Sequence, residues 1–381
     1  MANSRLIDNG ELPNVQTDTR FASFFNNKLK QVFFYITEVC NVRCRYCYYK
    51  PLLKPVTQAQ EITPSTFHAL AKIFKELGAS KLSFLGGEPS LYGMASDGRY
   101  NIGNLVEIAK NIGYEYVRMV TNGLFEESFL TNRKIKAIDE ITFSIDGSTA
   151  DIHDLERGKG TFVKTEKSII AAVKSGYNVQ LTACVNRSNI GYAKTGRLLV
   201  DEIIRWGEAI GVHSINFHPF IKMNVMRDEW TGTADISPQE WNFVYETINQ
   251  QVIDGQYNVA IRLPLRFVDS DKFHKRSKYY GYCPVKLAER IIIHANGNMN
   301  VCALHNATNT TLAKFREDGN ILKIEWSSCE NEFSKYVFNN SMEHPCTVIS
   351  HRHKEELPLC ISFKPTQNEF IWNKTGIEEV W

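Results

Sequence analysis

The sequence lacks any run of 18 apolar residues free of charge, and its polar first twenty residues lack the apolar core of a signal peptide. These absences exclude a typical membrane-spanning helix and a typical secretory signal. We therefore expect a cytoplasmic protein with no membrane partner. An excess of one charge is also missing, since 44 basic and 42 acidic residues leave a formal charge of +2. Without a strong overall field, the composition gives no reason to expect a nucleic-acid partner.

Internal repeats and low-complexity segments are absent too. Hydrophobic residues make up 43% of the 381 positions, which is enough for one large folded domain and a smaller one. The nine cysteines are unevenly grouped, with three near the start and five between Cys283 and Cys360. In a chain without an export signal, this grouping favours metal ligation over disulfides.

From residue 31 onward, short β-rich runs alternate with amphipathic helical stretches, which is typical of parallel βα units. The predicted strands cover residues 31–37, 81–86, 116–121, 140–146, 178–185 and 214–220, and predicted helices cover 65–78, 163–176 and 197–211. Six such strand–helix units predict an α/β fold whose sheet curves into a partial (β/α)6 TIM-like barrel. The chemically notable segments follow strand ends, where parallel sheets place their active sites.

A second region follows the predicted barrel. A helix predicted over 237–253 leads to alternating residues around Asn296-Gly297, which predict a β-hairpin. We therefore divide the chain into four parts: an N-terminal extension over 1–30, the barrel over 31–235, a helical linker over 236–280 and a smaller C-terminal domain over 281–381.

Three cysteines, Cys40, Cys44 and Cys47, share the spacing Cys-x3-Cys-x2-Cys after the first predicted strand. Three thiolates this close can hold three irons of a [4Fe–4S] cube and leave the fourth iron open to another ligand. An open position indicates cofactor or substrate chemistry, whereas structural sites close their coordination. The alternatives are three buried cysteines or a zinc site, although no fourth Cys or His lies between Thr37 and Pro55 to complete zinc.

This motif, with Tyr46 before its last cysteine, resembles the signature of the radical S-adenosylmethionine (radical SAM) superfamily. Gly86-Gly87-Glu88-Pro89, after the second predicted strand, is similar to the family's GGEP segment. The resemblance implies that Tyr46 and this segment bind SAM, the segment at the amino group of the methionine moiety. A carboxylate such as Glu88 beside exposed glycine backbone suits an ammonium group that approaches closely.

Two later segments, VTNG (120–123) and SIDG (144–147), resemble further strand ends of the same family. The resemblance implies that Ser144 hydrogen-bonds the ribose of SAM and that Arg157 faces its carboxylate. Turn residues and a surface salt bridge are the alternatives. The resemblance also implies reductive cleavage of SAM to methionine and a 5′-deoxyadenosyl radical, which abstracts a hydrogen atom from the substrate. A low-potential flavodoxin or ferredoxin is then expected as the electron donor.

The later cysteines are similar to the opening of SPASM and twitch domains, which carry auxiliary [4Fe–4S] clusters. By this resemblance the ligands of one auxiliary cluster are Cys283, Cys302, Cys346 and Cys360. The full SPASM pattern has more cysteines, so we expect no second auxiliary cluster. Dispersed core cysteines or a zinc ribbon are the alternatives, and His351 and His353 are alternative ligands.

Cys184 and His218 end two strands that are predicted to point into the barrel mouth. A buried cysteine and a packed histidine are the ordinary interpretations. The alternatives are that Cys184 donates a hydrogen atom to a substrate radical and that His218 contacts the substrate.

The predicted function is a radical SAM enzyme, oxidoreductase-type or peptide-modifying, that crosslinks, epimerises or oxidises a peptide in natural-product maturation. The preference for a peptide rests on the SPASM-like layout and is an argument by analogy. The alternative is a dehydrogenase or rearrangement enzyme acting on a sugar, nucleoside or alcohol. A non-enzymatic iron–sulfur carrier is disfavoured because carriers need closed coordination.

Overall fold

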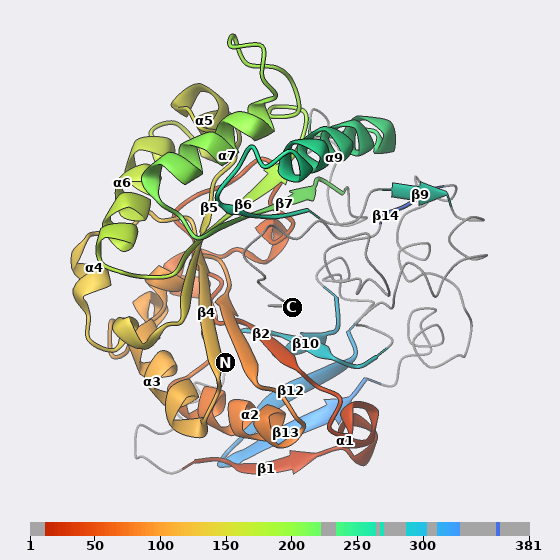
Figure 1. The fold of residues 1–381 in the computed structure, drawn as a ribbon. Helices are drawn as coiled ribbons and strands as arrows, with labels where there is room; N and C mark the ends of the chain where they lie inside the picture. Colours follow the sequence, from red (N-terminus) through yellow and green to blue (C-terminus); the bar gives the residue numbers. More distant parts are fainter. Residues whose placement is uncertain are drawn as a thin grey trace.

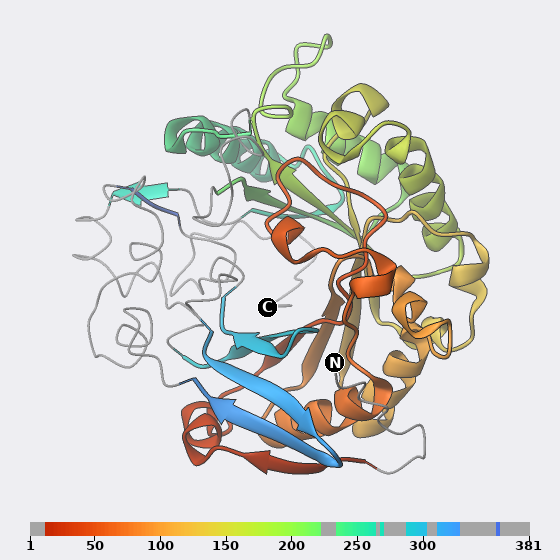
Figure 2. The same ribbon diagram turned by 180° about the vertical axis from the view of Figure 1, so that it is seen from behind.

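A curved sheet of twelve strands runs through the part of the chain that the structure describes. The structure is a computed structural model, and it describes residues 12–221, 234–263, 267–269, 287–302, 311–327 and 356–358. The strand order is β1-β13-β12-β11-β10-β2-β3-β4-β5-β6-β7-β8, and helices cover the outer face of the central strands (Figures 1 and 2).

Seven neighbouring strands run parallel and in chain order to form the barrel wall. They are β2 (Gln31–Tyr35), β3 (Lys81–Leu85), β4 (Tyr116–Thr121), β5 (Glu140–Ser144), β6 (Val179–Val185), β7 (Ser214–Pro219) and β8 (Ala260–Arg262). The prediction of an α/β partial barrel is confirmed, with β2 to β7 at the six predicted positions. The seventh strand, β8, has only three residues, too few to show a strand pattern in the sequence.

Helices follow the barrel strands, and some of them have clear end signals. They are α2 (Pro64–Glu76), α3 (Ile102–Ile112), α4 (Ser128–Thr131), α5 (Ala150–Arg157), α6 (Thr161–Lys174), α7 (Leu199–Ile210) and α9 (Pro238–Ile253). A capping box between Ser237 and Glu240 begins α9, and Gly211, in the left-handed region with φ 85°, ends α7. The four predicted helices correspond to α2, α6, α7 and α9.

The C-terminal strands continue the barrel sheet. The predicted hairpin is confirmed as β10 (Arg290–His294) and β11 (Asn298–Asn300), and β10 pairs in parallel with β2. Beyond it, β12 (Ala313–Asp318) and β13 (Ile321–Trp326) are antiparallel. A separate two-stranded sheet joins β9 (Phe267–Asp269) to β14 (Glu356–Pro358).

The N-terminal segment also joins the sheet. Strand β1 (Asn14–Thr17) pairs in parallel with β13, and α1 (Thr19–Phe25) follows it. Phe21 and Phe25 of α1 are fully buried in the main core. The division of the chain into four parts stays a prediction. The sheet runs from the barrel strands into the flanking strands (Figure 1).

The core between the sheet and α2 is aromatic. Phe34 of β2 and Phe67 of α2 have ring centroids 4.9 Å apart, and Phe84 of β3 lies 5.5 Å from Phe67. All three rings are fully buried, and burial of each contributes about 1.5–3 kcal/mol. Among the described helices, none is long and apolar enough to cross a membrane.

The segment after β3 lies directly against the segment after β2. The backbone N–H of Gly87 donates to the carbonyl of Thr37 at 2.8 Å, and that of Glu88 donates to Val39 at 2.7 Å. A Cβ atom on Gly87 would lie 2.0 Å from the Val39 carbonyl oxygen. Glycine is therefore required by the close approach of two backbones.

We predict that Gly87→Ala lowers the free energy of unfolding by about 3 kcal/mol, because the colliding atom belongs to backbone that cannot rotate away. Urea denaturation measures the effect. Gly191→Ala is the matched control, since its Cβ would meet nothing closer than Leu199 Cδ1 at 4.0 Å. Equal losses of stability in the two variants would contradict the account.

Candidate active site

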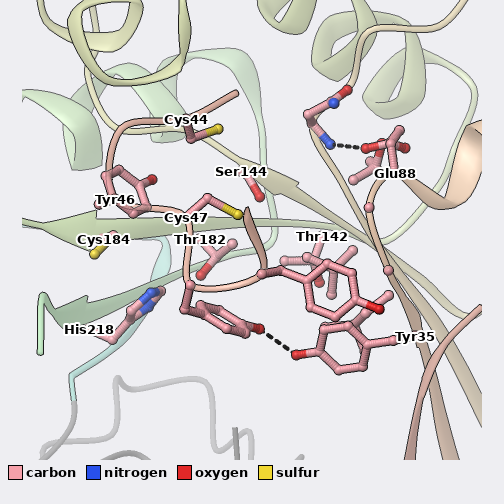
Figure 3. A pocket seen from close by; sticks show the side chains of 18 of the residues that line it. Tyr35, Cys44, Tyr46, Cys47, Glu88, Thr142, Ser144, Thr182, Cys184 and His218 are labelled. Carbon is pink, nitrogen blue, oxygen red and sulfur yellow. Dashed lines mark hydrogen bonds between the residues drawn. The ribbon is translucent and has the colours of Figure 1, made fainter. Parts of the chain in front are cut away.

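A cavity of about 430 Å³ lies inside the barrel, towards the carboxyl ends of its strands. Many of the residues predicted from the sequence to form the site line this cavity: Cys40, Cys44, Tyr46, Cys47, Gly86, Gly87, Glu88, Ser144, Arg157, Cys184, His218 and Cys302. Figure 3 shows Cys44, Cys47, Ser144 and His218 around the same space. Pro89 lies just behind, buried at the start of the short 3-10 helix η3 (Pro89–Leu91).

The three cysteines of the motif lie on the loop after β2. Cys44 is buried, Cys40 and Cys47 are half-buried, and none of them forms a disulfide. Burial raises the pKa of all three thiols, to about 12 for Cys40 and about 11 for Cys47. Such thiols ionise readily only when a cation lies beside them, as a bound metal ion would. Their chemistry therefore fits metal ligation.

The arrangement of the donors bears on the kind of metal. Within the described residues, no three His, Cys, Asp or Glu side chains surround a point suited to a single ion. A mononuclear zinc site needs four ligands around one point, whereas a [4Fe–4S] cube takes one thiolate for each iron. The three thiols of the loop match three of the four irons of such a cube.

Several contacts hold the cysteine loop in shape. Arg43 Nη1 donates to the carbonyl oxygens of Cys40, at 2.7 Å, and Val42, at 2.9 Å. The Arg45 backbone N–H donates to the Glu156 carbonyl at 2.9 Å, which ties the loop to α5. These bonds satisfy loop carbonyls that a helix or strand would otherwise pair.

A buried charge pair supports the loop from the other side. Arg157 Nε lies 2.6 Å from Asp146 Oδ2, and its Nη2 donates to the Tyr46 hydroxyl at 2.7 Å. The Tyr46 hydroxyl in turn donates to Asp146. Burial alone would raise the pKa of Asp146, but Arg157 and Tyr46 hold that pKa below its ordinary value. The three side chains form a closed network beside Cys44, whose sulfur is 4.0 Å from Arg157 Nη1.

Asp146 was missed as a site residue by sequence reasoning, although it lies within the SIDG segment. The signal was an acidic residue after a strand, followed by an arginine one helix later. The predicted contact between Arg157 and the SAM carboxylate stays a prediction. Arg157 already pairs with Asp146, and it also lines the cavity.

Glu88 joins the ends of two neighbouring strands. Its Oε1 accepts hydrogen bonds from Thr121 Oγ1 at 2.6 Å and from the Ser90 N–H at 3.0 Å. Its Oε2 accepts from the Asn122 N–H at 2.8 Å (Figure 3). Burial raises the pKa of Glu88 despite these bonds. In this structure the carboxylate positions the VTNG segment, and its contact with an ammonium group stays a prediction.

His153 supports the same region from α5. Its Nδ1 accepts a hydrogen bond from the Asp146 N–H at 3.3 Å, and the ring is fully buried. Burial lowers the pKa of His153 from its ordinary value of 6.5 to about 4. The imidazole is therefore neutral at pH 7. The hydrogen bond requires this, because Nδ1 can accept only when it carries no proton.

The pKa of His153 predicts a pH-dependent stability. Between about pH 6.5 and pH 4 the unfolded chain binds a proton at His153 that the folded protein does not, so stability falls as the pH drops. The expected slope from this residue is about 1.4 kcal/mol per pH unit. His153→Asn keeps an acceptor for the Asp146 N–H and should lose that part of the slope in urea unfolding at several pH values. Identical slopes in the two proteins would rule out the assignment.

Comparison with known proteins points to one family. Residues 34–195 match the model of the radical SAM superfamily. The GTP 3′,8-cyclase of Psychromonas ingrahamii is 27% identical over 237 residues, which cover 56% of this chain and 65% of that protein. The AdoMet-dependent heme synthase of Oleidesulfovibrio alaskensis is 24% identical over 210 residues, covering 55% of this chain and 50% of that protein. The chain thus spans less than two thirds of the length of these relatives.

Two solved structures are similar in fold. SuiB of Streptococcus suis, bound to its precursor peptide SuiA, superposes with a TM-score of 0.59 at 13% identity, covering 88% of this chain and 70% of that chain. The structure of anSMEcpe with bound AdoMet gives a TM-score of 0.55 at 17% identity, covering 75% of this chain and 77% of that chain. At these identities the likeness shows the fold alone.

The matched family segment contains the cysteine loop, the GGEP segment and the ends of β4 to β6, which together line the cavity. Motif, barrel and family match agree, and the predicted resemblance is confirmed: residues 34–195 match the radical SAM superfamily.

Proposed function

We propose that the enzyme reductively cleaves SAM at a [4Fe–4S] cluster held by Cys40, Cys44 and Cys47. Held there, the cluster would supply one electron for cleavage of SAM, and the barrel cavity would hold the substrate for abstraction of a hydrogen atom. The observation that carries this proposal is that three unpaired thiols on one loop line the same cavity as Glu88 and Arg157.

The chain's own residues position the cofactor and exclude water. Gly86, Gly87 and Glu88 line the cavity and are the proposed contacts of the ammonium group. Ser144, half-buried at the end of β5, offers a hydroxyl to the ribose, and Arg157 brings a fixed positive charge for the carboxylate. Tyr46 anchors the loop through Asp146 and presents its ring to the same space.

Combined substitution of Cys40, Cys44 and Cys47 by Ala is predicted to remove about four irons and abolish 5′-deoxyadenosine formation from SAM. Iron and sulfide analysis and chromatography of the products measure both effects in anaerobically reconstituted protein. Cys184→Ser is the matched control, because it removes a thiol from the same cavity outside the motif, and it should keep its iron. Persistent SAM cleavage in the triple variant would refute the proposal.

We propose one auxiliary [4Fe–4S] cluster on Cys283, Cys302, Cys346 and Cys360. Cys302 is buried, lines the cavity, and has Arg290 Nη2 3.4 Å from its sulfur, which suits a thiolate. The other three cysteines, together with His351 and His353, lie outside the described residues.

The auxiliary cluster predicts an iron content of about eight per chain, falling to about four when Cys302 and Cys346 are both replaced by Ala. Cys329→Ser, which removes a cysteine outside the proposed ligand set, should retain about eight. Mössbauer spectra distinguish the two clusters. About four irons in the unmodified protein would remove the auxiliary cluster from the account.

An external low-potential donor, a flavodoxin or ferredoxin, is the proposed source of electrons. Residues 39–60 contain four basic residues and no acidic residue: Arg43, Arg45, Lys50 and Lys54 are the basic ones. A positive surface beside the cluster loop favours encounter with an acidic electron-transfer protein.

The proposed substrate is a peptide, which the enzyme crosslinks, epimerises or oxidises. In support, the fold is similar over 88% of this chain to that of SuiB, which is bound to its precursor peptide. The second candidate is a small molecule, favoured by the names of the curated relatives, a GTP 3′,8-cyclase and a heme synthase.

A peptide encoded beside the gene is predicted to change mass when incubated with the reduced enzyme and SAM, as mass spectrometry would detect. Hydrogen loss or exchange at one residue is the expected change. Unchanged peptide, together with consumption of GTP or another small molecule under the same conditions, would contradict the peptide proposal and support the second candidate.

A further inference from the structure

The barrel cavity has two unlike walls. On one side, the lining residues of β2, β3, β4 and β10 include the apolar Phe33, Leu85, Val120 and Ile292, together with two arginines, Arg118 and Arg290. On the other side, β5, β6 and β7 line it with polar side chains: Thr142, Ser144, Gln180, Thr182, Asn216 and His218. A barrel interior that serves only as a core is filled by branched apolar residues. The polar wall therefore needs another explanation.

The polar wall is continuous because its residues are neighbours across the strands. Thr142 is paired with Gln180, and Thr182 is paired with both Ser144 and Asn216. Figure 3 shows Thr142, Ser144 and Thr182 on the same side of the cavity as His218. Inward-facing side chains on adjacent parallel strands form rows of this kind.

Two amide groups in this wall are only half satisfied. Asn216 Nδ2 donates to Thr182 Oγ1 at 3.3 Å, and Gln180 Nε2 donates to Ser214 Oγ at 3.0 Å. The oxygens Asn216 Oδ1 and Gln180 Oε1 accept no hydrogen bond from the described part of the chain. Both side chains are deeply buried, with 3% and 0% of their residue surface exposed.

The orientation of each amide decides whether its left-over group accepts or donates a hydrogen bond, and in this structure that group is the oxygen. Turning Asn216 or Gln180 over would present an NH2 group in place of the oxygen, because the neighbouring hydroxyl can either donate or accept. One polar group of each side chain is left over in both cases. Buried polar groups without protein partners are rare, and an ordered water, an ion or a bound ligand can satisfy them.

We propose that Asn216 and Gln180, with Thr142 and Thr182, form a substrate subsite for a neutral group carrying two or more O–H or N–H donors. The four wall residues carry no charge, and the free amide oxygens call for donors. The apolar body of the same group would pack against Phe33 and the other apolar wall residues. A sugar ring and the amide side chain of a peptide both have this chemistry. The inference rests on the proposed function, since it places the substrate where the radical would act.

Two pairs of probes test the subsite on the holoenzyme with SAM. Methyl β-D-ribofuranoside is compared with its per-O-methylated form, and N-acetylasparagine methylamide with its N,N-dimethyl side-chain amide. In the second member of each pair, methyl groups replace the hydroxyl hydrogens or the side-chain amide hydrogens, which removes those donors and adds bulk. Saturation-transfer NMR measures affinity at millimolar concentrations. We expect at least one donor-bearing probe to bind about tenfold more tightly than its methylated partner, and which pair responds indicates a sugar or a peptide source.

The variants Asn216→Leu and Gln180→Met remove the amides with little change in shape. Each is expected to erase the tenfold preference and to leave the melting temperature unchanged or raised, since an unpaired acceptor is removed. Two variants keep the test usable if one of them fails to fold. Gln250→Leu, on the exposed side of α9, is the control and should keep the preference.

Formation of 5′-deoxyadenosine in the same samples separates two kinds of failure. If no sample cleaves SAM, the proposed function fails. If SAM is cleaved but neither donor-bearing probe binds, the subsite is refuted. It is also refuted if the affinity is changed neither by methylation of the probe nor by the two substitutions.

Discussion

The close approach of two backbones, at Gly87 and Val39, is the constraint on which the site depends. Strands β2 and β3 pair as far as Tyr35 and Leu85, and the hydrogen bonds from Gly87 and Glu88 continue that pairing beyond the strand ends. The cysteine loop therefore leaves the sheet at a fixed position, one residue before Cys40. Because Glu88 accepts hydrogen bonds from the end of β4, the position of the loop is tied to three neighbouring strands, β2, β3 and β4.

A buried charged network completes this support. A buried ion pair stabilises a protein only when its remaining polar atoms are also satisfied. Here Asp146 accepts from Arg157, from Tyr46 and from the Cys184 N–H, at 3.1 Å for the last of these. The network joins the cysteine loop to β5, α5 and β6, so the thiols are held by the sheet on one side and by a fixed positive charge on the other. The cavity is left open between them.

The sequence alone predicted the barrel and part of the cavity lining, because both depend on local patterns. Strand and helix periodicities are short-range, and the cysteine motif and the Gly86–Pro89 segment are contiguous. The pairing of β10 with β2 was not predictable in this way, since it joins residues such as Arg290 and Gln31 that are far apart in the chain. Pairing of that kind depends on tertiary packing rather than local preference.

The same limit applies within the site. Asp146 can be recognised as a site residue only once Arg157 and Tyr46 are seen to bond to it. The free oxygens of Gln180 and Asn216 can be recognised only once the partners of the amide nitrogens are known. In the sequence these are ordinary polar residues in or after strands. The auxiliary cluster and the domain boundaries stay predictions.

The central claim is that the iron left open by Cys40, Cys44 and Cys47 takes SAM directly. Electron–nuclear double resonance of the reduced enzyme with SAM, labelled with 15N at the amino group and 17O at the carboxylate, tests this most directly. The account predicts strong hyperfine coupling of both labels to the cluster. Coupling no stronger than that of bulk solvent, with SAM shown to be bound, would contradict it.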